Sequence, residues 1–218
     1  MAGEAVEVQK CFRVLQQMRL AFDIIDRPRY PKDLPAFARS ASYYDVWKKI
    51  LDSRSCSIVL ADLSLLQFRH DDSGNWQSLA FYECPRDVGL YSDFRDLVGR
   101  DGSQDMKSTF VEVAETFSLK KNPLHVRYDF DPNAFVDGRH PYAHIHFGHN
   151  SPVRVACERL WIPSTMTAFV VRQFYPQVWI EFLTTHPRHG IIKKLRDGLS
   201  RVPAEYLQGK SMCEALVR

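Results

Sequence analysis

The sequence contains no Cys-x-x-Cys pair, and its five cysteines are odd in number and widely spaced. This pattern argues against a disulfide framework and against a structural zinc finger. We therefore expect reduced cysteines, buried mostly as small apolar side chains. The motif Gly-x-Ser-x-Gly is also missing, which excludes the nucleophile elbow of the α/β-hydrolases.

No run of apolar residues approaches the roughly 18 that a membrane span needs. The first residues include Glu4 and Glu7 in place of an apolar leader segment. These two absences predict a cytoplasmic protein without a membrane partner. The formal net charge is only +3, so wholesale binding of a phosphate backbone is not implied, while a local basic groove stays open.

The chain has 218 residues, of which 45% are hydrophobic, and this is enough for one domain with a sizeable core. We predict a single α+β domain over residues 1–218. Its expected parts are an N-terminal helical segment (1–53), a sheet core with inserted helices (54–162) and C-terminal helices (163–218).

Two periodicities alternate along the chain. Apolar residues at three- and four-residue steps predict helices, which cover residues 5–25, 43–51, 91–98, 106–117 and the segment after Pro163. Branched and aromatic runs predict strands, which cover residues 57–70, 76–82, 124–131, 142–148 and 152–160. The expected fold is an antiparallel sheet of about five strands with helices packed on its apolar face. No Gly-rich phosphate loop follows a strand, which excludes Rossmann and P-loop folds.

The strand predicted over residues 124–131 has one ionisable face. His125, Arg127 and Asp129 alternate with Val126 and Tyr128. Because successive side chains of a strand point to opposite faces, the first three residues share one face and the other two share the apolar face.

The next two predicted strands repeat this alternation. Tyr142, His144 and His146 share one parity, and Arg154 lies on the equivalent face of the third strand. Sequential strands usually pair, so we expect these polar faces to merge into one patch. Ordinary solvated faces favour lysine, glutamate and threonine, whereas this one favours histidine and arginine. The turn before the second strand, which contains Arg139, would place His140 at the edge of the patch.

Two chemistries fit this patch. In the first, His144 and His146 act as a general acid–base pair, Asp129 orients a histidine, and Arg127 and Arg154 bind phosphate. His125, His140, Tyr142 and Arg139 are then candidates for substrate binding. This arrangement is typical of a metal-independent ribonuclease or phosphodiesterase.

In the second chemistry, His144, His146 and Asp129 hold a divalent metal with an open position for water. Gly138 followed by His144-x-His146 matches the opening of the cupin signature, but the expected glutamate does not follow. Gly148 stands where histidine-triad hydrolases have a third histidine, which disfavours that family. The cofactor therefore stays open between none and a divalent metal.

The segment from residue 124 to residue 179 carries a block of spaced residues: Arg127-x-Asp129, His140-Pro141-x-x-His144-x-His146-x-Gly148, Arg154, and a Pro-initiated helix leading to Phe174-Tyr175-Pro176. This block resembles an uncharacterised prokaryotic family, described as a domain of unknown function. The resemblance implies a bacterial family often encoded near mobile or defence genes, and it brings no known activity. In outline, the motifs are also similar to those of toxin nucleases.

Together these features predict a nucleic-acid-processing hydrolase, namely a ribonuclease or phosphodiesterase of bacterial toxin or anti-phage type. RNA is the favoured nucleic-acid partner, and an inhibitory or effector protein is a further partner that such a role would involve. Two alternatives stay open. They are a metal-dependent, cupin-like enzyme acting on a small molecule, and a non-catalytic subunit that binds a nucleotide or another partner.

Overall fold

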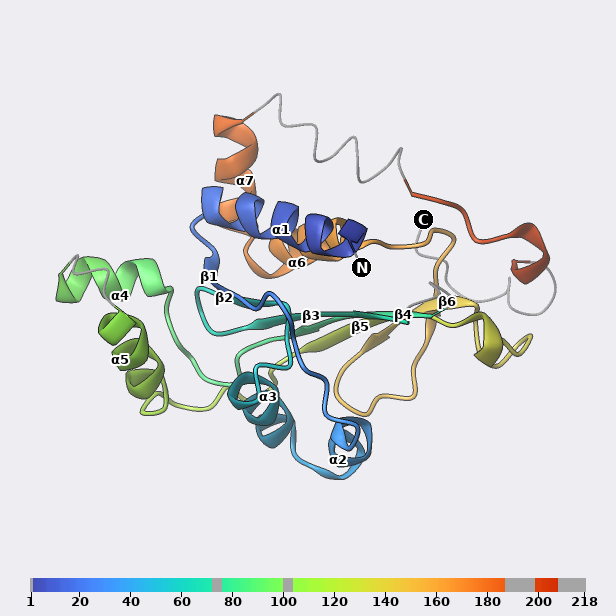
Figure 1. Cartoon of the computed structure of the whole chain (residues 1–218), viewed down its shortest axis with the longest axis horizontal. Coiled ribbons are helices and arrows are strands. Elements are labelled where there is room, and N and C mark those ends of the chain that lie inside the picture. Colours follow the sequence, from blue (N-terminus) through green and yellow to red (C-terminus); the bar gives the residue numbers. More distant parts are fainter. Residues whose placement is uncertain (1, 72–75, 100–103, 187–198, 208–218) are drawn as a thin grey trace. The chain divides into compact units, whose positions relative to one another are not determined.

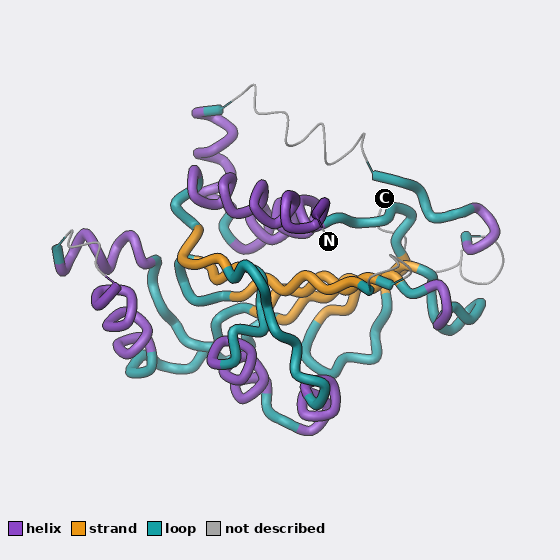
Figure 2. The backbone as a smooth tube through the Cα atoms, viewed as in Figure 1, coloured by secondary structure: helices purple, strands orange, loops and turns teal. Residues whose placement is uncertain are grey.

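The computed structural model describes residues 2–71, 76–99, 104–186 and 199–207. These residues form seven α-helices and one antiparallel sheet whose seven strands follow one another in sequence order (Figures 1 and 2). The helices are α1 (Ala2–Gln17), α2 (Leu34–Ser40), α3 (Tyr43–Asp52), α4 (Tyr91–Val98), α5 (Gln104–Ala114), α6 (Pro163–Phe174) and α7 (Pro176–Thr185). The strands are β1 (Ala21–Ile24), β2 (Ile58–Leu60), β3 (Leu65–His70), β4 (Gln77–Tyr82), β5 (His125–Phe130), β6 (Ala143–Phe147) and β7 (Val155–Ala156). The α+β class is confirmed, but the sheet has more strands than the five expected.

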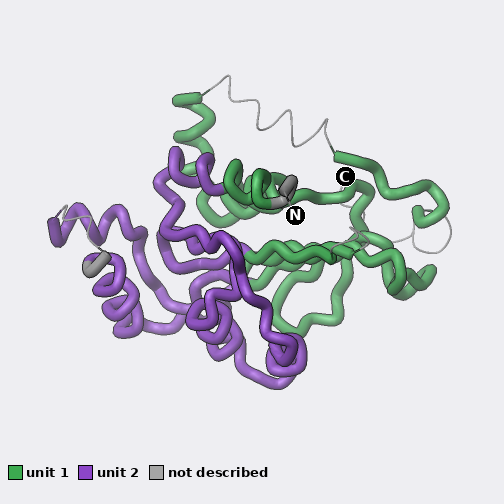
Figure 3. The backbone as a smooth tube through the Cα atoms, viewed as in Figure 1, with its two compact units in different colours: residues 1–11, 67–81, 125–218 green, residues 12–66, 82–124 purple. Residues whose placement is uncertain are grey.

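The chain falls into two compact units, each built from separate stretches of sequence (Figure 3). Unit 1 comprises residues 1–11, 67–81 and 125–218, and unit 2 comprises residues 12–66 and 82–124. The single domain expected over residues 1–218 stays a prediction.

In unit 2, the first predicted helix ends earlier than expected. Arg19 adopts a left-handed conformation with φ 57°. Its N–H donates to the carbonyl of Gln16, and the N–H of Leu20 donates to the carbonyl of Leu15. This is the Schellman arrangement that terminates helices, formed here without the usual glycine. Residues 21–24 therefore form strand β1 on β2, and the helix predicted through residue 25 is wrong at that end.

Unit 2 contains one further strand because the single strand predicted over residues 57–70 forms two strands, β2 and β3. Within residues 57–70, Leu63 turns the chain with φ 65°, and the N–H of Leu60 donates to the carbonyl of Ser64. Strand β2 then pairs antiparallel with the start of β3. Leu63 is buried, so the turn lacks the exposed glycine or asparagine that normally marks one.

The helices of unit 2 follow the predicted periodicity closely. Helix α3 extends one residue beyond the predicted end, and its N-cap Ser42 accepts the N–H of Asp45. Helix α4 has the predicted bounds, residues 91–98. Helix α5 covers residues 104–114 in place of 106–117. Helix α2, which has Pro35 in its first turn, was not predicted.

In unit 1, the apolar face of β5 packs toward α6. Tyr128 is fully buried, and its ring stacks on Trp161 with 5.5 Å between centroids. Trp161 in turn contacts Phe169 of α6. Figure 1 shows α6 on one side of strands β5 and β6, while the chain that follows β6 loops across the other side. The prediction that helices cover the apolar face is confirmed for this helix.

The end of unit 1 departs from the predicted elements. The strand expected over residues 152–160 shrinks to β7, because the chain beyond it bonds to residues 200–202 instead. Helix α6 begins at Pro163 with Ile162 as its N-cap. Helix α6 ends at Phe174, and α7 starts at Pro176. Residues 191–217 have a weakly helical sequence pattern, but most of them lie outside the described residues. Within the described part, a 3-10 turn covers Ala204–Tyr206.

Four of the five cysteines lie in the described residues, and all four are free and buried, as predicted. Cys157 is the one nearest the predicted site, and burial raises the pKa of its thiol to about 12. A thiol that stays protonated is a poor nucleophile. Among the described helices, none combines the length and the apolar character required to cross a membrane.

Removing the phenol oxygen of Tyr128 should weaken unit 1. The backbone N–H of Trp161 donates to this oxygen over 3.1 Å inside the core. In Tyr128→Phe that N–H loses its partner, so we expect the free energy of unfolding to fall by about 1–3 kcal/mol. Urea denaturation followed by circular dichroism measures this change. Tyr142→Phe, whose ring is only half-buried, is the control, and equal losses in both variants would contradict the assignment.

Candidate metal centre

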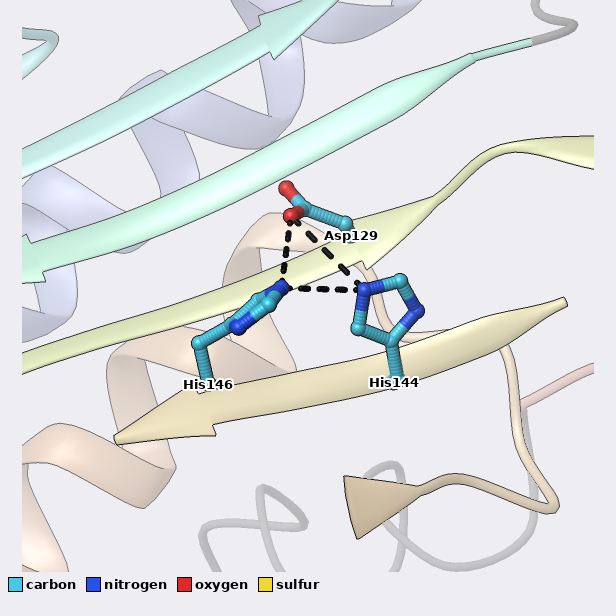
Figure 4. A group of neighbouring side chains, drawn as sticks. All are labelled: Asp129, His144 and His146. Atoms are coloured by element: carbon cyan, nitrogen blue, oxygen red, sulfur yellow. Dashed lines mark hydrogen bonds and ion pairs between the residues drawn. The ribbon is translucent and has the colours of Figure 1, made fainter. Parts of the chain in front are cut away.

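The register of β5 and β6 brings the predicted residues together on one face. Asp129 lies opposite His144, and Arg127 lies opposite His146. Directly opposed residues of an antiparallel pair project to the same face, with Cβ atoms about 5 Å apart. Figure 4 shows the carboxylate of Asp129 and both imidazoles converging between the two strands. The expected shared face of these two strands is therefore confirmed.

The converging atoms are one carboxylate oxygen and two imidazole nitrogens. The Nε2 atoms of His144 and His146 are 3.0 Å apart. The Oδ2 atom of Asp129 lies 3.4 Å from Nε2 of His146 and 4.0 Å from Nε2 of His144. These three residues form a possible metal site in the described part of the chain. We call them the triad.

A backbone carbonyl orients the first imidazole. Nδ1 of His144 lies 3.0 Å from the carbonyl oxygen of Pro141. Because a carbonyl can only accept, the proton of neutral His144 must be on Nδ1. Its Nε2 then carries a lone pair that faces the other two members of the triad. Metal-binding histidines typically hold their second nitrogen in this way.

The carboxylate of Asp129 is held by two further side chains. Nε of Arg127 donates to Oδ2 over 2.8 Å, and buried Ser78 on β4 contributes another hydrogen bond. Burial alone would raise the pKa of Asp129, but the hydrogen bond with His146 and the charge of Arg127 outweigh it and hold this pKa well below its usual value. Asp129 is therefore an anion across the physiological pH range. Sequence periodicity offered no signal for Ser78 or for the Pro141 carbonyl.

The three histidines on the ionisable face of β5 and β6 are buried. His125, His144 and His146 expose 6%, 1% and 6% of their surface. Burial lowers the pKa of His144 to about 4, even though Asp129 favours its charged form. Burial, with help from the charge of Arg127, lowers the pKa of His125 to about 3. The imidazoles of His125 and His144 are thus neutral near pH 7.

The connection from β6 to β7 lies close to one of these histidines. It runs on the side of strands β5 and β6 that faces away from α6 (Figure 1), and its His149 ring lies 6.5 Å from the ring of His125. Ala156 of β7 sits opposite His144 on the same face. An alanine at this point leaves the imidazole free of a large neighbour on that strand.

His140 and Arg154 lie beside the triad. The ring of His140 meets the ring of His144 edge-on, with 4.7 Å between centroids. Burial and the nearby charge of Arg154 lower the pKa of His140. Arg154 directly precedes β7, where His144 pairs with Ala156. It therefore belongs to the same neighbourhood, although it is not part of a third long strand.

Other predicted residues lie elsewhere. The ring of Tyr142 stacks on Tyr206 at 4.0 Å, and Arg139 is exposed in the loop before β6. Asp131, which shares the parity of Asp129, caps a 3-10 turn instead. Glu158 pairs with Arg201, so neither Asp131 nor Glu158 is part of the triad. The substrate-binding roles of Tyr142 and Arg139 stay predictions.

In chemical terms, the triad offers two imidazole nitrogen donors and one anionic oxygen donor from neighbouring strands. Two imidazoles and one carboxylate are a common ligand set for zinc, manganese and iron, with positions left open for water or substrate. Arg127, whose side chain is 40% exposed, adds a fixed positive charge next to these positions.

No curated protein and no solved structure matches the chain. The model of one protein family, described as an uncharacterised conserved protein (DUF2290), matches residues 8–201. This match spans the triad, both neighbouring residues His140 and Arg154, and most of both units. The chain therefore belongs to the DUF2290 family.

Proposed function

We propose that the chain is a metal-dependent hydrolase that cleaves phosphodiester bonds in nucleic acid, with RNA as the favoured substrate. The observation that carries this proposal is the convergence of Asp129, His144 and His146 beside the guanidinium of Arg127. The toxin or anti-phage role suggested by the sequence is part of the same proposal.

The spacing of the donor atoms supports a metal ion. A dication held at about 2.1 Å, with angles of about 90–110° between its ligands, keeps donor atoms about 3.0–3.4 Å apart. Two of the three distances in the triad are 3.0 Å and 3.4 Å, and the third is 4.0 Å. Small side-chain rotations would bring the third into the same range.

The electrostatics favour metal binding over an acid–base pair. A general acid should have a pKa near the working pH, whereas the pKa of His144 is about 4. A metal ligand must instead be unprotonated. The lowered pKa values of His144 and Asp129 satisfy this condition near pH 7.

The charge next to the triad supports a phosphate substrate. A bound dication lowers the pKa of a coordinated water and polarises a phosphoryl oxygen. Arg127 uses its Nε for Asp129, and a guanidinium has further N–H donors suited to phosphate oxygens. Water would add to phosphorus, one P–O ester bond would break, and the leaving oxygen would take up a proton.

A second candidate is a small-molecule reaction at an iron centre. Two histidines and one carboxylate are also the ligand set of non-haem iron oxygenases. The nearly complete burial of His144 and His146 favours a small substrate over a polymer. The same experiment separates the two candidates.

The test combines metal analysis with substrate assays. Purified protein should contain about one transition-metal ion per chain by elemental analysis. It should cleave RNA, and it should lose cleavage after chelation and regain it when the same metal is added. Parallel incubations with single-stranded and duplex DNA define the substrate.

Three other results would redirect the proposal. Bound iron with no cleavage of any nucleic acid favours the second candidate. Cleavage that survives complete chelation would restore the acid–base mechanism. Failure to bind Zn²⁺, Mn²⁺ or Fe²⁺ in equilibrium dialysis would remove the metal centre altogether.

A further inference from the structure

We infer that His140 and Arg154 form an anion-binding subsite that holds a phosphate group of the substrate other than the one being cleaved. This inference rests on the proposed function for the identity of the substrate. Its physical basis is a pair of buried nitrogen atoms beside the triad whose hydrogen-bonding capacity is unused.

The two residues come from different segments, and both lie near His144. His140 ends the turn in which Val136 and His140 form an isolated bridge, and its ring packs against the ring of His144. Arg154 precedes β7, and continuing the register of β6 and β7 would place it opposite His146. Its charge is close enough to His140 to influence that imidazole.

Both residues carry a buried nitrogen that finds no partner among the described residues. These atoms are Nδ1 of His140 and Nε of Arg154. Arg154 does donate from Nη1 to the carbonyl of Pro152, over 3.3 Å. A buried polar atom without a partner costs about 1–3 kcal/mol, and such atoms in folded proteins call for an explanation such as a ligand or an ion.

The donor chemistry selects the ligand class. A guanidinium presents a planar fork of N–H groups that fits two oxygens of one anion. In the described salt bridges, no carboxylate neutralises Arg154. An imidazole N–H nearby adds a third donor, and three donors around one positive charge match a phosphate group. The triad and Arg127 would hold the cleaved phosphate, so this subsite would hold a neighbouring one.

That neighbouring phosphate has two possible sources. It is either a terminal phosphate monoester or the next diester along the strand. A terminal phosphate would make the protein act at nucleic-acid ends, whereas a diester would allow internal cleavage. The chemistry of recognition is the same, so the substrates in the test must differ in this respect.

The first measurement is binding of inorganic phosphate by isothermal titration calorimetry. It uses the full chain after chelation, so that phosphate cannot coordinate a metal. Arg154→Gln and His140→Gln are compared with Arg172→Gln, which changes an exposed arginine in the last turn of α6. Loss of a charge-assisted hydrogen bond weakens binding roughly 10–100-fold. We expect a weakening of that size in Arg154→Gln, a smaller one in His140→Gln, and wild-type affinity in Arg172→Gln.

The second measurement is steady-state cleavage of matched oligonucleotides with a 5′-phosphate, a 3′-phosphate or only hydroxyl ends, using metal-loaded protein. Arg154→Gln should raise KM about tenfold or more, with a much smaller change in kcat and with unchanged metal content. If Arg154→Gln raises KM for only one of the two phosphorylated oligonucleotides, the ligand of the subsite is a terminal phosphate monoester. An equal effect on all three substrates identifies a diester.

The outcomes separate the subsite from the proposed function. Arg154-dependent phosphate binding without any nucleic-acid cleavage would keep the subsite and reject the nuclease. Cleavage with equal phosphate affinity and equal KM in wild type and both variants would reject the subsite and keep the nuclease. Thermal unfolding of each variant establishes that it is folded, and His140→Gln decides the matter if Arg154→Gln does not fold.

Discussion

Replacing His144 and His146 together with alanine should abolish metal binding and lower nucleic-acid cleavage by more than about 100-fold. The physical reason is that both Nε2 donors of the triad disappear and leave Asp129 as a single ligand. Changes to residues that merely support a metal ligand cost about 10–100-fold in affinity or activity. Removing two ligands should exceed that range. Elemental analysis and initial cleavage rates measure the effect.

The double variant needs a control, because both imidazoles are buried. His186→Ala removes an exposed histidine at the end of α7, and it should retain metal and activity. Far-ultraviolet circular dichroism establishes that each variant is folded. Overproduction in a bacterium gives a second comparison, in which the wild type should slow growth and the double variant should not. Full metal content in the folded double variant would contradict the proposed centre.

Lowering the pH should reduce the unfolding free energy of the metal-free protein within a specific pH window. His125 should account for a large share of this loss. The pKa of this histidine falls from 6.5 to about 3 on burial, so below pH 6.5 the unfolded chain binds a proton that the folded chain does not. Stability is then fully present above about pH 6.5 and is lost progressively toward pH 3. One such proton corresponds to about 1.4 kcal/mol for each pH unit.

His144 adds to the same slope, because burial lowers its pKa to about 4. Asp129 contributes at lower pH, since its stabilising charge is lost only below the usual carboxyl range. Urea denaturation of chelated protein at several pH values between 4.5 and 7 therefore measures the contribution of the histidines to stability separately from that of Asp129. In His125→Gln the pH slope of the unfolding free energy should fall by about 1 kcal/mol per pH unit.

His186→Gln is the matched control for this slope, because it changes an exposed histidine. Its slope should equal that of the wild type. The comparison uses slopes and not absolute stabilities, so any packing defect introduced by His125→Gln cancels. Parallel slopes in all three proteins would mean that His125 takes up its proton in the folded state.

The helices were predictable wherever local signals were strong. Helix α4 lies where apolar periodicity placed it, and α3 begins where Ser42 can cap it. Errors arose where a residue without a turn signature adopts a left-handed conformation. Arg19 ends α1, and Leu63 divides one predicted strand into two. A left-handed conformation at such residues costs about 1–2 kcal/mol and is imposed by surrounding packing, which local sequence does not reveal.

The candidate site was predictable in part. The alternation of polar and apolar residues identified Arg127, Asp129, His144 and His146 as members of one face. It did not identify Ser78, which lies on β4, far away in the sequence. The same alternation predicted a third strand that was too long. Residues after β7 form hydrogen bonds with the segment near residue 200 and do not extend the strand.

The sequence by itself determined which side chains share a face within β5 and within β6, because successive side chains of an extended strand point to opposite faces. The tertiary structure decided that Asp129 stands opposite His144, that His149 of the loop after β6 lies beside His125, and that Pro141 orients one imidazole. These features depend on the register between segments and on a turn between them. They are set by long-range packing, and so no local pattern of residues encodes them.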